Sequence, residues 1–316
     1  MTGFLTTYDG EIWQLPALTS WEITRTDGDG CDGALIQFIY EPGRLCVLQK
    51  ACRLRLEEDG TTRFFGVVDE CAAQFGQEGR TVTLSCRGLQ ALLQDNALRA
   101  VQFRHMTLSD ALRHFVFPFG IDKVQSRQLP ALDFFSVETG NTAWQALRGF
   151  CRHSAGVYPR FSADGTLLFD PESTTTRRLH SNCGVLHAEL RRCIYGVITR
   201  QIVVSSGYED VETAEQDDFL ARGGNCQKVS MRVGPAKKAD WRTAAQRVSE
   251  SAKKEFLLTV TVAGDFTALP GDTISVELDG AGFFGNFLLR TVKTELSAAG
   301  RRTTLTMEGG AGHVAI

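Results

Sequence analysis

Phe65–Val68 (FGVV) and Gly79–Gly88 (GRTVTLSCRG) form a strand, a polar turn and a second strand. The same pattern returns about 220 residues later, in Gly285–Val292 (GNFLLRTV) and Gly300–Gly309 (GRRTTLTMEG). In both copies a Thr-rich strand with alternating character leaves a turn marked by Gly and stops at another Gly. Two matched hairpins at the ends of long β-rich segments predict a duplicated β domain, and two similar domains in one chain double the symmetry that an oligomer presents.

Length and composition indicate a chain that is folded almost throughout. At 316 residues it exceeds what one hydrophobic core usually serves, so two or three domains are expected. Hydrophobic residues make up 43% and charged residues 22%, which is typical of globular proteins. A net charge of −3 and a pI near 6.1 argue against binding to nucleic-acid backbones as the main task. Nucleic acid that merely passes through a lumen remains compatible with this charge.

The nine cysteines are an odd number and are widely scattered, which favours reduced thiols in a protein made in a cytoplasm. The amino terminus does not resemble a secretory signal, and no apolar run approaches the ~20 residues of a membrane-spanning helix. We therefore expect neither secretion by that route nor membrane insertion.

The order of patterns along the chain predicts a mainly β protein with an α+β insert. Residues 1–96 contain alternating strands and Asp-Gly turns, as in a small antiparallel β-barrel. Residues 97–188 contain two helix starts, at Thr107 and at Asn141–Thr142, and form the smaller α+β domain. Residues 189–316 return to the β pattern, with Tyr195–Val204 as a strand and one helix near 240–255, and form a second, related barrel.

The series of motifs resembles the tail hub, or baseplate hub, proteins of contractile bacteriophages, namely the late control protein D group and its relatives in phage Mu and in Gram-positive prophages. The residues that carry this resemblance are Phe65–Val68, Gly79–Leu84, Gly140–Leu147 before Cys151, Ala163–Leu167, Ala268–Asp272 and Gly285–Phe287. Their order and spacing extend over most of the chain.

The resemblance implies a structural protein of a virion tail baseplate or of a phage-like particle, synthesised in the bacterial cytoplasm and working without a cofactor. It implies a homotrimer in which two barrels per subunit make a pseudo-six-fold ring with a central channel. The ring would join the six-fold tail tube protein to the three-fold central spike protein, and the tape measure protein is a further candidate partner.

A structural zinc site is one alternative for four residues within a short segment, His180, Cys183, His187 and Cys193. Their spacing lacks the tight Cys-x2-Cys knuckle of zinc fingers, so ordinary buried or edge positions are favoured.

Enzymatic activity is not expected, because the chain has no nucleophile elbow and no recognisable Ser–His or Cys–His motif. The alternative function is a tail-associated peptidoglycan hydrolase, since a pair of catalytic carboxylates could be hidden among the 37 acidic residues.

Two groups of residues are candidates for contacts with partners. Adjacent residues of a strand point to opposite faces, so either Phe283 or Phe284 is expected at a subunit contact. An acidic stretch is read as a solvated loop or as a surface that faces a partner or the channel, and it contains Glu209, Asp210, Glu212, Glu215, Asp217 and Asp218.

Overall fold

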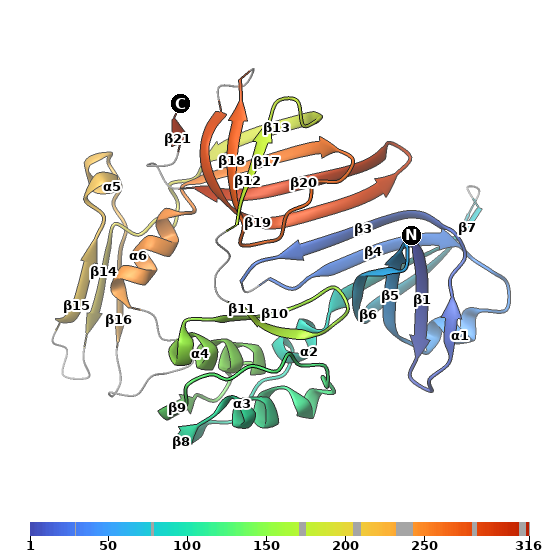
Figure 1. Cartoon of the computed structure of the whole chain (residues 1–316), viewed down its shortest axis with the longest axis horizontal. Helices are drawn as coiled ribbons and strands as arrows, with labels where there is room; N and C mark the ends of the chain where they lie inside the picture. The colour runs from blue at the N-terminus through green and yellow to red at the C-terminus, as the bar shows by residue number, and fades with distance from the viewer. Residues whose placement is uncertain are drawn as a thin grey trace.

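The computed structural model describes residues 1–28, 30–76, 79–170, 175–204, 210–231, 243–279, 283–309 and 314–315. Within these residues the chain is mainly β, as predicted, with several short helices. None of the described helices is long and apolar enough to cross a membrane. Four groups of elements are visible in Figure 1, and we call them the first β unit, the α+β unit, the small unit and the second β unit.

The first β unit is an antiparallel sheet with the strand order β3-β4-β7-β6-β5-β1-β2. One face of its strands carries the apolar residues, so alternate side chains such as Leu54, Leu56, Val82 and Leu84 are fully buried. Its elements are β1 (Thr2–Thr7), β2 (Ile12–Gln14), β3 (Leu18–Thr26), β4 (Gly33–Ile39), α1 (Leu45–Gln49), β5 (Ala51–Glu58), β6 (Thr61–Gly76) and β7 (Gly79–Gly88).

The α+β unit follows, with α3 and α4 packed on each other around a separate core that includes Phe135, Leu147 and Phe150. Thr107 and Thr142 cap these two helices with reciprocal side-chain hydrogen bonds, which confirms both predicted helix starts. Its elements are α2 (Gln90–Gln94), β8 (Val101–Met106), α3 (Leu108–Phe115), η1 (Phe117–Phe119), β9 (Leu132–Val137), α4 (Ala143–Ala155), β10 (Tyr158–Phe161) and β11 (Leu167–Asp170).

The second β unit has the strand order β13-β17-β20-β19, with β18 also paired to β19 and β12 running parallel to β18. The boundary at residue 188 expected from the sequence falls inside β13, a strand of this unit. Its elements are β12 (Thr176–His180), β13 (Val185–Arg192), β17 (Phe256–Ala263), β18 (Thr273–Leu278), β19 (Phe283–Ser297), β20 (Gly300–Gly309) and β21 (Val314–Ala315).

The small unit is inserted between β13 and β17, and the sequence did not predict it as a separate body. Tyr195–Val204 was expected in the second barrel, yet Arg200–Val204 is the central strand of its own three-stranded sheet, β15-β14-β16. Its elements are β14 (Arg200–Val204), β15 (Asp210–Glu215), α5 (Asp217–Ala221), β16 (Gln227–Met231) and α6 (Ala244–Ala252).

The repeated hairpins are present and share one register. β6 pairs with β7 and β19 pairs with β20, and each pair shifts register once, at Asp69 in β6 and at Arg290 in β19. The neighbouring strands repeat as well, because β4 lies beside β7 as β17 lies beside β20, and β5 beside β6 as β18 beside β19. The predicted duplication is therefore visible in the strand order.

The structure does not confirm the two closed barrels expected from the sequence. Among the described residues neither β unit closes on itself; instead β3 of the first unit pairs with β19 of the second, and the two units form one continuous sheet (Figure 1). The reason is that the edge of β3 is used by the other unit and not by the far end of its own sheet.

Candidate functional site

The pairing of β3 with β19 is the main contact between the two β units, and we call it, with the ion pairs across it, the junction. The two strands are antiparallel, and their register runs from Thr291 opposite Thr26 to Leu296 opposite Trp21. Both strands alternate apolar and polar residues, so one face of the junction continues the buried core side and the other carries polar side chains.

Ion pairs reinforce the backbone pairing at one end of the junction and in its middle. Arg290 lies 2.6 Å from Asp27 and 2.8 Å from Glu308, so it connects the two units beside the register shift of β19. Lys293 lies 3.3 Å from Glu22 of β3. These contacts make the junction more specific than backbone hydrogen bonds alone, because they fix which residues lie opposite each other.

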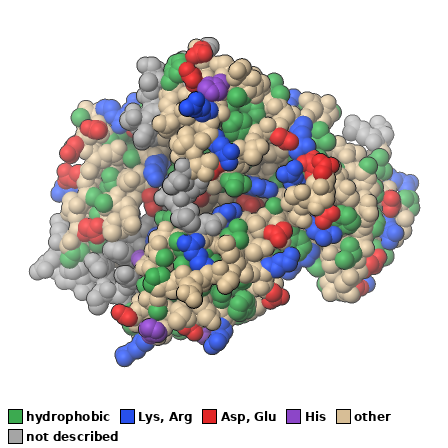
Figure 2. Space-filling model, viewed as in Figure 1, with side chains coloured by type: hydrophobic (Ala, Val, Ile, Leu, Met, Phe, Trp, Pro, Cys, Tyr) green, Lys and Arg blue, Asp and Glu red, His purple; other side chains and the backbone are tan. Residues whose placement is uncertain are grey.

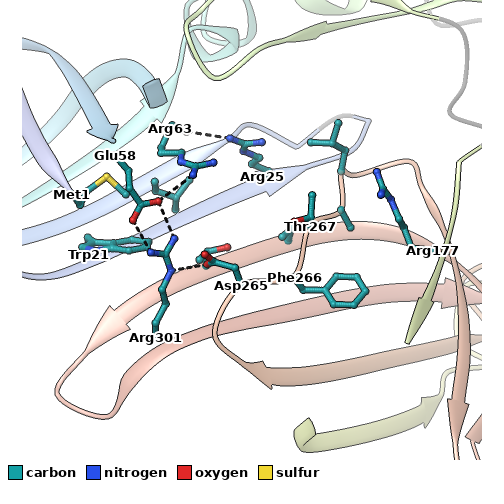
Figure 3. Close-up of a pocket in the computed structure, with 15 residues that line it drawn as sticks. Met1, Trp21, Arg25, Glu58, Arg63, Arg177, Asp265, Phe266, Thr267 and Arg301 are labelled. Carbon is teal, nitrogen blue, oxygen red and sulfur yellow. Dashed lines mark hydrogen bonds and ion pairs between the residues drawn. The ribbon is translucent and has the colours of Figure 1, made fainter. Parts of the chain in front are cut away.

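Arg301 makes the densest set of contacts across the junction (Figure 3). Its guanidinium binds both oxygens of Glu58, at 2.6 and 3.0 Å, and lies 2.6 Å from Asp265. It also lies over the ring of Trp21, 5.1 Å from the centroid. The hydrogen bonds from Arg301 hold the pKa of Glu58 below its ordinary value, so this carboxylate is ionised at neutral pH.

A cavity of about 340 Å³ opens beside these residues, between the two β units. Four arginines line it, namely Arg25, Arg63, Arg177 and Arg301. Two of these charges are met by a carboxylate, since Arg63 pairs with Glu58 and Arg177 with Asp272. Arg25 donates a hydrogen bond to the backbone carbonyl of Arg63. Burial lowers the pKa of Arg25. Figure 2 shows basic and acidic side chains side by side over this face of the molecule, without a broad area of one charge.

The chemistry of the cavity suits a structural contact better than hydrolysis. Its two carboxylates, Glu58 and Asp265, both bind Arg301. A glycosidase needs one carboxylic acid with a raised pKa to protonate the leaving group. Glu58 has the opposite shift, so the cavity does not support the hydrolase alternative.

A buried carboxylate outside the predicted candidates ties the small unit to the second β unit. Glu255, just before β17, is fully buried and accepts hydrogen bonds from Arg192 of β13 at 2.9 Å and from Arg222 at 2.9 Å. Burial raises the pKa of Glu255, but the bonds from Arg222 and Arg192 outweigh it and leave this pKa below its ordinary value. Nothing in the local sequence signals these contacts, because the three residues lie far apart in the chain.

The predicted aromatic pair lies on β19 but at the opposite end from the junction. Phe284 is about a third exposed and its backbone pairs with Glu277 and Ala315. The side chain of Phe283 lies outside the part of the chain that the structure describes.

The acidic stretch is not an open loop where the structure describes it. Glu212 accepts a hydrogen bond from the backbone N–H of Ala244 at the start of α6, at 2.8 Å, and Glu215 pairs with Arg200 at 2.8 Å. Asp217 and Asp218 form the first turn of α5. Glu209 lies outside the described residues, and Asp210 is described only as the first backbone position of β15.

The zinc candidates are spread over β12, a turn and β13. His180 lies 3.2 Å from Glu277, and Cys183 packs against the core of the second β unit. His187 is on β13 and Cys193 follows that strand. Over the described ranges no three His, Cys, Asp or Glu side chains converge as metal ligands would.

Comparisons with known proteins agree with this architecture. Residues 91–170 match the family model described as "Baseplate hub protein gp44-like, second domain". A comparison with curated protein sequences returned no match.

Several solved structures share the fold over almost the whole chain. The 43 kDa tail protein of prophage MuSo2 from Shewanella oneidensis has a TM-score of 0.74 at 18% identity, covering 97% of this chain and 98% of that one. The tail protein from Neisseria meningitidis MC58 has a TM-score of 0.69 at 20% identity, covering 97% and 96%. The E. coli c3393 protein, a component of the type VI secretion system, has a TM-score of 0.53 at 15% identity, covering 93% and 74%.

The resemblance to phage tail and baseplate hub proteins drawn from the sequence is thereby confirmed: the chain is similar to them in its α+β unit by sequence and in its whole fold by structure.

Proposed function

We propose that this chain is the structural hub of a contractile phage tail or of a phage-like injection particle. Three copies form a ring with a central channel, and the ring joins the six-fold tail tube to the three-fold spike. The observation that carries this proposal is the internal repeat: each chain has two β units with the same strand order, joined edge to edge. Three such chains supply six similar positions, as a joint between six-fold and three-fold partners requires.

The proposed partners are a tail tube protein, a central spike protein and, through the channel, a tape measure protein. Nucleic acid would only pass through, which agrees with the mixed charge of the face in Figure 2. Phe283, Phe284 and the acidic stretch are proposed contacts with these partners or with a neighbouring subunit, and the exposed part of Phe284 is compatible with that role.

The proposed role needs no catalysis. The two carboxylates of the cavity are bound to one guanidinium, and the similar proteins are tail and baseplate proteins. Incubation of the purified chain with peptidoglycan provides the test, and measurable solubilisation would contradict a purely structural role.

Light scattering of the purified chain tests the hub itself. We expect the mass of three subunits, and electron microscopy of the mixture with tail tubes is expected to show the ring at tube ends. A chain that stays monomeric and never caps a tube would overturn the proposal.

A further inference from the structure

Among the described residues several strands of the continuous sheet have a free edge, β2 and β12 among them, and two such edges, on β6 and β13, are the ones that the internal repeat relates to the junction. Residues 70–75 of β6 pair with β7 on one side, while β5 reaches only as far as Val67 on the other side. β13 pairs with β17 on one side and with no described strand on the other. We call these segments the β6 edge (residues 70–75) and the β13 edge (residues 188–193). Exposed strand edges are unpaired rows of N–H and C=O groups that readily add another strand.

The internal repeat indicates which strand can pair with the β6 edge and which with the β13 edge. β6 occupies the place of β19, since both pair with the same neighbours and carry the register shift at equivalent positions. β13 occupies the place of β3, because β13 lies beside β17 as β3 lies beside β4. Both of these pairs also shift register at equivalent positions, at Leu186 in β13 and at Thr19 in β3. The two free edges are therefore the counterparts of the two strands that meet at the junction.

We propose that the β13 edge of one subunit adds to the β6 edge of the next, repeating between chains the junction that each chain makes internally. This inference rests on the proposed function and specifies its subunit contact. The register follows from the junction: Glu70 takes the place of Thr291 and Cys193 that of Thr26, so Glu70 lies opposite Cys193. The antiparallel pairing then runs to Phe75 opposite Ala188.

The backbone groups of both edges point the right way for this pairing. The N–H of Cys193 donates to the carbonyl of Glu255, on the side of β17. Because direction alternates along a strand, Arg192, Leu190 and Ala188 direct their backbone groups outward. At the junction the N–H of Asp27 donates to the carbonyl of Arg290, so every second residue of β3 faces β19. On the β6 edge the residues whose backbone groups point outward are Cys71, Ala73 and Phe75. In the proposed register they lie opposite Arg192, Leu190 and Ala188 of the β13 edge.

The side chains are compatible with the same register. Ala73 lies opposite Leu190, an apolar pair on the core face. Phe75, with 61% of its surface exposed, lies opposite Ala188 and close to Leu186, with 56% exposed. On the other face Glu70 is diagonal to Arg191, and small Ala72 leaves room between them. Such exposed aromatic and aliphatic side chains on a free edge are typical of a covered interface.

A second copy of this chain is the partner that the geometry favours. The contact joins two different surfaces, so repeating it adds subunits in one direction, and it closes into a ring if the rotation allows. In this arrangement one rotation superimposes the first β unit of a chain on its second β unit. The same rotation superimposes that second unit on the first unit of the next chain.

The test uses one new cysteine and one native cysteine. Glu70 and Cys193 form a pair without mutual hydrogen bonds, with Cα atoms expected about 4.5 Å apart, inside the ~4.4–6.8 Å range of disulfides. Glu70→Cys in the full chain is oxidised mildly and analysed on a non-reducing gel. We expect covalent dimers and trimers, at least about tenfold above wild type, because only a correct register brings the sulfurs together.

Two controls fix the register. Glu70→Cys combined with Cys193→Ser is expected to lose the cross-link. Gln74→Cys, on the same strand face but opposite Glu189, is expected to give only the wild-type background. Cross-links in either control at the level of Glu70→Cys would overturn the register.

The outcomes separate the edge pairing from the hub. A chain that is trimeric by light scattering but shows no cross-link dependent on Cys193 overturns the edge pairing and leaves the hub intact. A chain that is monomeric at every concentration overturns both. Covalent products longer than three chains contradict a closed ring of three.

Discussion

Arg301 is the residue on which the charged contacts of the junction converge. It lies on β20, yet it binds Glu58 of the first β unit and Asp265 of its own unit. Arg301→Met leaves the mostly buried Glu58 without its bidentate partner, so the chain should lose about 1–3 kcal/mol of stability. Chemical unfolding followed by tryptophan fluorescence, to which Trp21 beneath Arg301 contributes, measures the loss.

The control for this change is Arg200→Met. Arg200 pairs with Glu215 at 2.8 Å, but both side chains are nearly half exposed, at 48% and 45%. Such a surface pair contributes about 0.2–1 kcal/mol, so this variant should unfold almost as the wild type does. Equal losses in the two variants would show that the contacts of Arg301 do not stabilise the junction.

Two carboxylates make stability depend on pH in the acid range. The pKa values of Glu58 and Glu255 are lowered in the folded chain from an ordinary 4.5, so they stabilise the fold above that pH, and this contribution is lost as the pH falls through their folded values. The unfolding temperature should be level from neutral pH to about 5.5 and fall below about 4. Glu255→Gln should be less stable at neutral pH and lose less on acidification; parallel curves for the two proteins would contradict this assignment.

At the residue scale the sequence predicts what is local. Thr107 and Thr142 cap helices through residues three positions away, so both caps can be predicted from the sequence. Glu255 binds Arg192 and Arg222, which come from separate parts of the chain, and no local spacing encodes that meeting.

Substitutions at the β6 edge can test the proposed subunit contact separately from the folding of the monomer. At Ala73 the backbone N–H faces the free β6 edge, whereas at Ala72 it faces β7. Ala73→Pro should leave the monomer folded and weaken self-association by about tenfold or more, because Pro removes one interchain donor and disturbs the edge. Light scattering over a concentration series measures the change.

Ala72→Pro is the matched control on the neighbouring residue. It removes a donor from the hairpin itself, so it should lower the unfolding temperature, which Ala73→Pro should leave nearly unchanged. If both variants associate like the wild type, the β6 edge is not a subunit contact.

Both hairpins could be predicted because only two residues separate the paired strands, before Gly79 and before Gly300, and such short connections leave a clear signal in the sequence. The junction could not be predicted, because Thr26 and Thr291 are separated by nearly the whole chain. The alternation of apolar and polar residues does not specify which strand will pair with a given edge. The small unit was missed for a related reason: β14 alternates like the strands of the second β unit, and only its partners distinguish it.

Assembly of the whole molecule can be tested at Phe284. With 36% of its surface exposed, its change to Asp should leave the chain folded and weaken its binding to a neighbouring subunit or tail partner. Phe287→Asp on the same strand is the control, since Phe287 is 1% exposed and a buried charge there should unfold the second β unit. Circular dichroism and light scattering report the two effects, and a Phe284→Asp protein that assembles normally would remove this residue from the proposed contacts.

The acidic stretch allows a similar separation of structure from assembly. Glu212 and Glu215 have local partners, so replacing all six acidic residues would mix loss of folding with loss of contacts. Changing only Asp217 and Asp218 to Ser should alter stability by less than about 1 kcal/mol, as at most surface positions, while reducing particle assembly or injection. Normal particles from this double variant would indicate that Asp217 and Asp218 are solvent-exposed residues without a partner contact.

The union of β3 with β19 also has a consequence for how the chain is made. A ribosome completes β3 long before it reaches β19, because the α+β unit, the small unit and several strands lie between them in the chain. During that interval the nascent first β unit exposes a strand edge whose proper partner does not yet exist, and such long-range pairing forms slowly. Neighbouring nascent chains on one messenger carry the same exposed edge, together with the β6 edge, which is the counterpart of β19 in the internal repeat. Slow or crowded translation should therefore favour mispaired chains, and the yield of native protein should rise when fewer ribosomes share the messenger.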